Sequence, residues 1–165
     1  YHKYRWPSPS SEEEVRRMTW VSHVALTGTI AYAVTADPML TAAAAVGAVL
    51  PDKIEGTPAR QGWRTWRSRH RGWSHWPMLY LALIGALTQA KAYFFYDATF
   101  FPVLTWIFGG ALCHIAEDAV CGKVPLLYPT QKVGIRLFTV GSLREYLFVL
   151  VCIGMIYTVQ YLLHM

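Results

Sequence analysis

Long apolar segments constrain this chain more than any other feature of its sequence. Four of them approach the roughly 20 residues that a helix needs to cross the hydrocarbon core of a bilayer, and a fifth is shorter. Only 15% of all residues are charged, whereas about 25% is usual for a soluble domain. We therefore expect an all-α, polytopic membrane protein of about five helices, four of them spanning and one short. In chain order the segments are residues 18–36, 38–50 (the short one), 76–93, 99–116 and 143–163.

The sequence favours a single helical membrane domain. We expect residues 1–17, which are polar, to form a lead rather than a cleavable signal peptide, and residues 18–165 to form the domain. Asp37 and Pro38 have the pattern of a helix cap followed by proline at the first helical position. The first two segments therefore indicate a helical hairpin. The three cysteines lack zinc-ribbon spacing, and we interpret them as free thiols.

Basic residues are concentrated in alternate connections between the segments. If the five segments alternate in direction, the polar lead and the loops at 51–75 and 117–142 lie on one side of the membrane and hold most of the lysine and arginine. Lys91 falls on the other side. The positive-inside rule places the basic side in the cytoplasm. We therefore expect a membrane protein with its basic loops and the ionisable residues near them on the cytoplasmic side.

Tryptophans are interleaved with arginines in and next to the loop at 51–75. The tryptophans are Trp63, Trp66, Trp73 and Trp76. Such a pattern can bind single-stranded nucleic acid, but an aromatic belt at the membrane interface explains it with fewer assumptions. We therefore expect membrane lipids as partners, keep subunits of a membrane complex as an alternative, and do not expect nucleic acid.

The five-segment arrangement brings six ionisable side chains to the basic face. Ionisable groups at a membrane edge are costly and indicate function by default. His114 and Asp118 are four residues apart and so share one face of a helix. Imidazole and carboxylate groups are standard ligands of zinc, manganese and iron, so we predict a metal site at this one face. The six residues are His23, Asp52, His75, His114, Asp118 and Glu145.

The stretches around these residues resemble a known family, the bacterial inner-membrane proteins described as LexA-regulated, membrane-bound, metal-dependent hydrolases. The resemblance covers roughly residues 18–150 and implies a location in the bacterial inner (cytoplasmic) membrane, with the metal site on the cytoplasmic side. The order of the histidines and aspartates is also similar to that of the zinc phospholipase C and single-strand nuclease superfamily, whose members are helical and cleave phosphoesters with zinc ions. The matching stretches are Ser22-His23, Leu50-Pro51-Asp52, 70–75, 114–118, 124–129 and 141–145.

The resemblance also implies a ligand set. His23 would help to hold a second ion, with Asp118 as a bridge between the two. The family pattern has a second aspartate where this chain has Ile54, and a hydroxyl residue where it has Trp76, so the number of ions, one or two, is left open. The first divalent ion, zinc with manganese as the alternative, would be held by Asp52, His75, His114 and Asp118.

Together these expectations predict a metal-dependent hydrolase at the cytoplasmic interface. Its substrate would be a lipid-linked phosphoester. Bound metal would polarise a phosphoryl oxygen and generate hydroxide near neutral pH. Arginine can pair with phosphate oxygens in a bidentate manner. We assign substrate binding to Arg69, His70 and Arg71. Glu55, Glu117 or Glu145 would accept or deliver a proton.

Two alternatives from other classes stay open. The protein could be a non-catalytic membrane subunit or structural partner whose metal site ties helix ends together, and four protein ligands on one ion would favour this reading. It could also be a transporter or ion pathway, since His and Asp chains relay protons. Against the transporter, no ionisable residue falls at the middle of an apolar segment, and no repeat of broken helices is present in the sequence.

Overall fold

The computed structural model describes residues 18–57, 60, 62, 65, 66, 70–94, 100–163 and 165. The predicted polar lead at 1–17 and the predicted substrate residue Arg69 lie outside the described residues. Within them, the prediction of an all-α fold is confirmed, with five helices of ten residues or more. The described residues also contain two strands of two residues each, β1 (Val124–Pro125) and β2 (Lys132–Val133). The two strands pair antiparallel within the loop at 122–142.

The N-terminal hairpin consists of α1 (Trp20–Thr35) and α2 (Pro38–Gly47). Asp37 caps α2 as its sequence pattern predicts, because its Oδ1 accepts from the N–H groups of Met39 at 2.7 Å and Leu40 at 3.2 Å. The turn between the helices passes through Ala36, whose φ of 50° is left-handed.

The second arm of the hairpin ends earlier than predicted. It stops at Gly47, and a separate short helix, α3 (Leu50–Glu55), follows. Pro51 has no N–H to donate back to Gly47, so it fits the start of a new helix better than the interior of a continuing one. Asp52, expected just after a helix end, therefore lies within α3.

Three longer helices follow the short 3₁₀ turn η1 (Trp73–His75). They are α6 (Pro77–Phe94), α7 (Phe100–Cys121) and α8 (Leu143–Leu163). Helix α7 continues beyond its apolar segment because the polar side chains of its last turns, Glu117 and Asp118, are buried and hydrogen-bonded within the protein. In the described part of the chain, α7 and α8 are long and apolar enough to cross a membrane.

Helices α2 and α7 touch backbone to backbone. A Cβ on Gly110 would lie 2.0 Å from the carbonyl oxygen of Ala44, and one on Gly47 would lie 1.9 Å from that of Ile107. Only glycine permits such an approach, which is the use that membrane helices make of small residues. The contact sets the position of α2, and of α3 directly after it, against α7.

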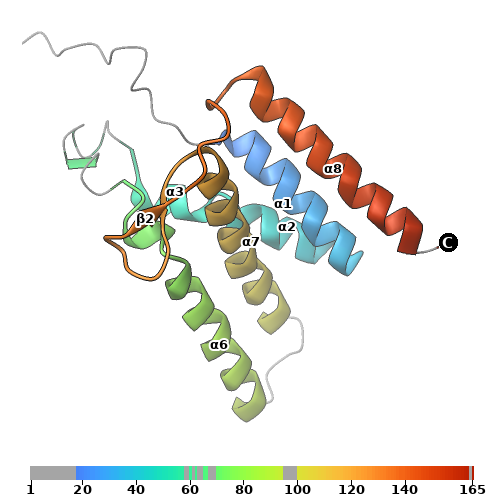
Figure 1. Ribbon diagram of the computed structural model, residues 1–165. Coiled ribbons are helices and arrows are strands. Elements are labelled where there is room, and N and C mark those ends of the chain that lie inside the picture. The colour runs from blue at the N-terminus through green and yellow to red at the C-terminus, as the bar shows by residue number, and fades with distance from the viewer. Residues whose placement is uncertain are drawn as a thin grey trace, which may run out of the picture.

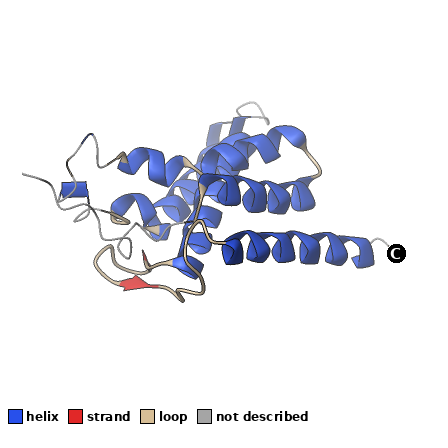
Figure 2. Cartoon of the chain, turned by 90° about the horizontal axis from the view of Figure 1, so that it is seen from above, coloured by secondary structure: helices blue, strands red, loops and turns tan. Residues whose placement is uncertain are grey.

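The helices diverge from one common end. Figure 1 shows that α1, α6 and α8 begin, and α7 ends, near the loops that carry α3 and β2. Seen from above in Figure 2, the loops and the strand gather at one end and the helices lead away from it. Side chains distant in sequence can therefore meet at this end.

Candidate metal centre

Four buried side chains surround one point at the common end of the helices. Asp52 comes from α3, His75 from η1, and His114 and Asp118 from α7, and none is more than 4% exposed. The two histidine Nε2 atoms lie 3.3 Å apart. Asp52 Oδ1 lies 3.5 Å from Nε2 of His75 and 3.9 Å from Nε2 of His114. Asp118 Oδ2 lies 3.6 Å and 3.7 Å from the same two nitrogens.

These separations suit a four-coordinate ion. Zinc binds nitrogen and oxygen ligands at about 2.0–2.2 Å in a tetrahedron, whose edges are then roughly 3.3–3.6 Å. Five of the six edges of such a tetrahedron span 3.3 to 3.9 Å, so these five need to contract by only a few tenths of an ångström. Asp52, His75 and His114 form one group able to hold a metal, and Asp118 and His114 belong to a second, overlapping one.

The hydrogen bonds of both histidines turn a lone pair toward this point. Nδ1 of His114 lies 2.6 Å from the carbonyl oxygen of Ala48, and a carbonyl can only accept, so this nitrogen carries the proton. Nδ1 of His75 lies 3.3 Å from Oε2 of Glu55 and 3.0 Å from Oγ of Ser74, so a proton on this nitrogen has an acceptor outside the cluster. The two Nε2 atoms lie within hydrogen-bond distance of each other at 3.3 Å, and a cation between them would accept a lone pair from each.

The two aspartates are oriented in the same way. Asp52 accepts from Nε1 of Trp20 with Oδ2 at 2.8 Å, and its Oδ1 faces the histidines. Asp118 accepts with Oδ1 from Nη2 of Arg71 at 2.9 Å and from the N–H of Met18 at 3.3 Å. Its Oδ2 is buried and has no hydrogen-bond partner among the described residues. A buried carboxylate oxygen in this state is costly, and the ligand position of a metal would satisfy it.

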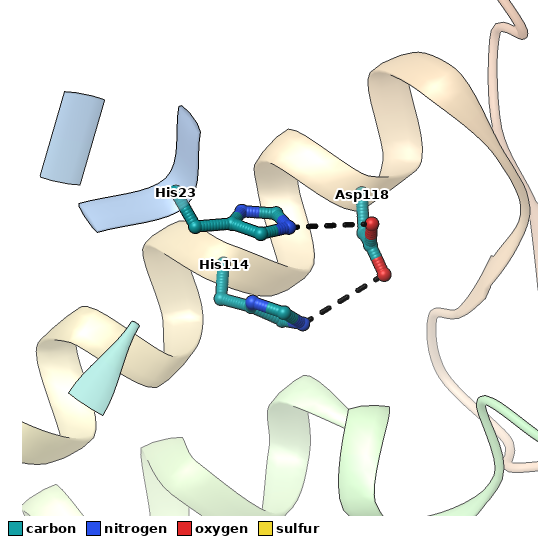
Figure 3. A group of neighbouring side chains, drawn as sticks. All are labelled: His23, His114 and Asp118. Carbon is teal, nitrogen blue, oxygen red and sulfur yellow. Dashed lines mark ion pairs between the residues drawn. The ribbon is translucent and has the colours of Figure 1, made fainter. Parts of the chain in front are cut away.

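His23 lies beside the four donors without being part of the tetrahedron. Its Nδ1 lies 2.5 Å from Oε2 of Glu117, which also accepts from Thr27, and its ring stacks on His114 at a centroid distance of 3.9 Å. Figure 3 shows the rings of His23 and His114 both turned toward Asp118. Nε2 of His23 lies 3.6 Å from Asp118 Oδ1. This nitrogen is buried and finds no hydrogen-bond partner within the described residues.

Glu55 organises the loop on the outer side of His75. Its carboxylate lies 2.6 Å from Nδ1 of His70 and accepts from the backbone N–H of Arg71 at 3.3 Å. His70 stacks on Trp66 at a ring-centroid distance of 4.2 Å, and its Nδ1 faces Glu55. The guanidinium of Arg71 pairs with Asp118, and the substrate-binding roles of Arg71 and His70 stay predictions.

Glu145 lies at the common end of the helices but contacts none of the four donors in the hydrogen bonds described for it. Its carboxylate accepts from the N–H and hydroxyl of Thr19 at 2.9 Å each, from the hydroxyl of Ser22 at 2.6 Å and from the N–H of Gly141 at 2.7 Å. These bonds tie the start of α8 to the start of α1. The proton-transfer role predicted for Glu145 stays a prediction.

Two residues that depart from the resembled pattern lie apart from the donors. The side chain of Ile54 is 61% exposed. Nε1 of Trp76 donates to the carbonyl of Leu127 at 3.1 Å, which holds the loop at 122–142 against η1. Because residue 54 is an exposed isoleucine and not the aspartate of the resembled pattern, this position adds no carboxylate to the cluster.

Several residues that support the donors carry no signal in the sequence. Nothing near Trp20 marks it as the partner of Asp52, and the contacts of Ala48 and Met18 are made by backbone atoms. Ser74 alone had a local clue, since it directly precedes His75.

The fold and the site together define a helical membrane protein with a buried cluster of histidines and carboxylates that could hold a metal ion. The chain belongs to the YdjM inner membrane protein family, whose model matches residues 18–164. Family membership and the two apolar helices indicate a membrane location. No curated protein and no solved structure matches the chain.

Proposed function

We propose that this protein is a membrane-embedded, metal-dependent hydrolase that holds zinc, with manganese as the alternative, at Asp52, His75, His114 and Asp118. One observation carries the proposal. Each of these side chains uses one polar atom in a hydrogen bond or close polar contact outside the cluster and turns the other toward the same point. Such outer partners are what orient metal ligands in proteins.

The chemistry of the donor set supports hydrolysis of a phosphoester. When bound, a divalent ion would supply polarisation of a phosphoryl oxygen and activation of water. Glu55 would hold the imidazole of His75, and Glu117 would hold that of His23. The two glutamates would thus act on proton transfer through a histidine rather than directly, and Nε2 of His23 is the buried nitrogen placed to exchange a proton.

The surroundings of the site favour a lipid-linked substrate. The loop at 122–142 exposes Leu127 by 58% and Tyr128 by 65%, and Trp73 beside it is 66% exposed. Lys123 and Lys132 lie in the same loop. Apolar and aromatic side chains mixed with cations suit the interface of a membrane with anionic headgroups.

The same surface supports the proposed topology. We place α1 and α6 across the membrane with α7 and α8, and the common end of the helices on the cytoplasmic side, because the basic loops lie there. Membrane lipids are the partners of the outer helix faces, and α8, whose apolar side chains are largely exposed, offers a face to other membrane subunits. Regulation by LexA, which the resemblance also implies, would be a property of the promoter.

A structural metal site is the second candidate function. It is favoured by the burial of the donors, since His75, His114 and Asp118 are 0% exposed and four protein ligands complete a tetrahedron. Closed sites of this kind stabilise folds, whereas catalytic ones keep a position open.

The two candidates are separated by one set of assays. Zinc-loaded protein in detergent is tested against a nitrophenyl phosphoester and against vesicles containing anionic phospholipid, beside Asp118→Asn and, as a control carboxylate outside the site, Asp37→Asn, which still caps α2. Hydrolysis that needs the metal, is lost in Asp118→Asn and persists in Asp37→Asn supports the hydrolase. Bound zinc that raises the melting temperature without hydrolysis of either substrate favours the structural site.

A further inference from the structure

We infer that the centre binds one cation rather than two, because the guanidinium of Arg71 takes the place at Asp118 that a second cation would need. The inference rests on the metal site of the proposed function and specifies it further. Arg71 is the residue that would limit the number of ions to one.

The two oxygens of Asp118 face different partners. Oδ2 faces the imidazoles of His75 and His114. Oδ1 receives Nη2 of Arg71 at 2.9 Å and the N–H of Met18 at 3.3 Å. A carboxylate oxygen has two lone pairs, and both lone pairs of Oδ1 are thus engaged. The oxygen that would bridge to a second ion is already saturated by donors from the protein.

His23 marks where the second ion would otherwise bind. Its Nε2 lies 3.6 Å from Asp118 Oδ1, a separation that two ligands of one ion could have. The group of metal-ligand spacing that contains His23 and Asp118 also includes His114, whose Nε2 faces the first ion, so His23 and Asp118 would be the protein ligands of the second. An ion there would share Oδ1 with a guanidinium, and two positive charges on one buried oxygen repel strongly.

Arg71 cannot simply swing aside. Its side chain is buried, its φ of 52° is left-handed, and its backbone N–H donates to the Glu55 carboxylate. Its Nη1 lies 3.5 Å from the carbonyl oxygen of Lys123. A non-glycine residue keeps a left-handed φ only where its surroundings hold it there. The arginine is therefore a fixed positive charge beside the predicted ion.

The experiment counts bound zinc per chain in detergent-purified protein equilibrated with buffered zinc, then desalted and analysed by mass spectrometry of the metal. The variants are Arg71→Gln, which removes the charge, Arg71→Lys, which keeps it, and Arg71→Gln combined with His23→Ala. We expect one equivalent in the wild type and in Arg71→Lys. We expect a second equivalent in Arg71→Gln that disappears when His23 is also replaced.

Two equivalents in the wild type would overturn the inference and leave the metal-dependent function standing. One equivalent in an Arg71→Gln protein whose melting curve still shows a folded state would overturn it as well. An absence of zinc from the wild type would instead overturn the proposed function itself. Cobalt substitution gives a second readout, since its visible spectrum reports the coordination of each ion without any assay of activity.

Discussion

Nε2 of His75 lies 3.3 Å from Nε2 of His114, although 39 residues separate the two histidines in the chain. Each ring has its Nδ1 engaged on the opposite side, by Glu55 for His75 and by Ala48 for His114. Both Nε2 atoms therefore face a position that a shared cation could occupy.

Removal of zinc by a chelator is expected to destabilise the protein. Because an ion that binds only the folded state stabilises it by about 2.7 kcal/mol at a hundredfold excess over its dissociation constant, we expect a loss of roughly this size. Thermal unfolding in detergent, with and without chelator, measures it. His114→Ala should show the same melting temperature under both conditions, and an equal response of the variant and the wild type would contradict the site.

Glu55→Gln is expected to weaken zinc binding without abolishing it. The neutral amide no longer matches the N–H groups of His70, Arg71 and His75 that converge on the carboxylate, and loss of such an outer partner costs about 10–100-fold in metal affinity. Competition with a chromophoric chelator measures the change. The matched control is Asp37→Asn, which caps α2 far from the site and should leave the affinity unchanged, since asparagine caps as well as aspartate.

Gly110→Ala is expected to destabilise the protein, whereas Gly109→Ala is not. A Cβ at Gly110 would lie 2.0 Å from the carbonyl oxygen of Ala44, and one at Gly109 would meet nothing within 4 Å. Overpacking of this kind costs about 1–3 kcal/mol, while alanine at an open helical position gains roughly 0.5–1 kcal/mol over glycine. Unfolding of both variants in detergent tests the difference, and similar stabilities would show that α2 and α7 are not in backbone contact.

Glu145→Ala is expected to loosen α8 from the start of α1. The change leaves the buried hydroxyl of Ser22 without its acceptor, at a cost of about 1–3 kcal/mol for a buried group left unpaired. It also removes the acceptor of the backbone N–H groups of Thr19 and Gly141. Faster proteolysis between α7 and α8 reports the loosening, and zinc content should stay at the wild-type value. A loss of zinc equal to that of His114→Ala would instead place Glu145 in the metal centre.

The proposed orientation predicts opposite labelling of the two ends of the helices. In a background without cysteine, Leu127→Cys at the end that carries the site should react with a membrane-impermeant maleimide only after the inner membrane is opened. Tyr93→Cys, at the far end of α6 and 76% exposed, should react in intact spheroplasts. The reverse pattern would place the site outside the cytoplasm.

The sequence predicts the helices well because apolar segments are a local property of the chain. It also predicts that His114 and Asp118 share a face, since their spacing matches the helical repeat. The split of the second arm at Gly47 was missed, because the apolar run continues through Gly47 to Leu50 and the contact that accompanies the break lies in α7. The extension of α7 to Cys121 was missed because the burial of Glu117 depends on His23 and Thr27 in another helix.

The outer contacts of the site could not be predicted in the same way. Arg71 and Asp118 are 47 positions apart, and nothing in either neighbourhood distinguishes an arginine that pairs with a ligand from one that binds phosphate. The bond from Trp20 to Asp52 requires α1 and α3 to be placed side by side, which only the complete fold does.

The backbone contact between α2 and α7 has a consequence for how this site tolerates change over time. The carbonyl of Ala48, which holds His114, directly follows Gly47, whose main chain touches that of Ile107. The acceptor is therefore positioned by atoms that every amino acid possesses. Substitutions on the outer face of α2 can accumulate without disturbing the histidine, provided that the two glycines are retained.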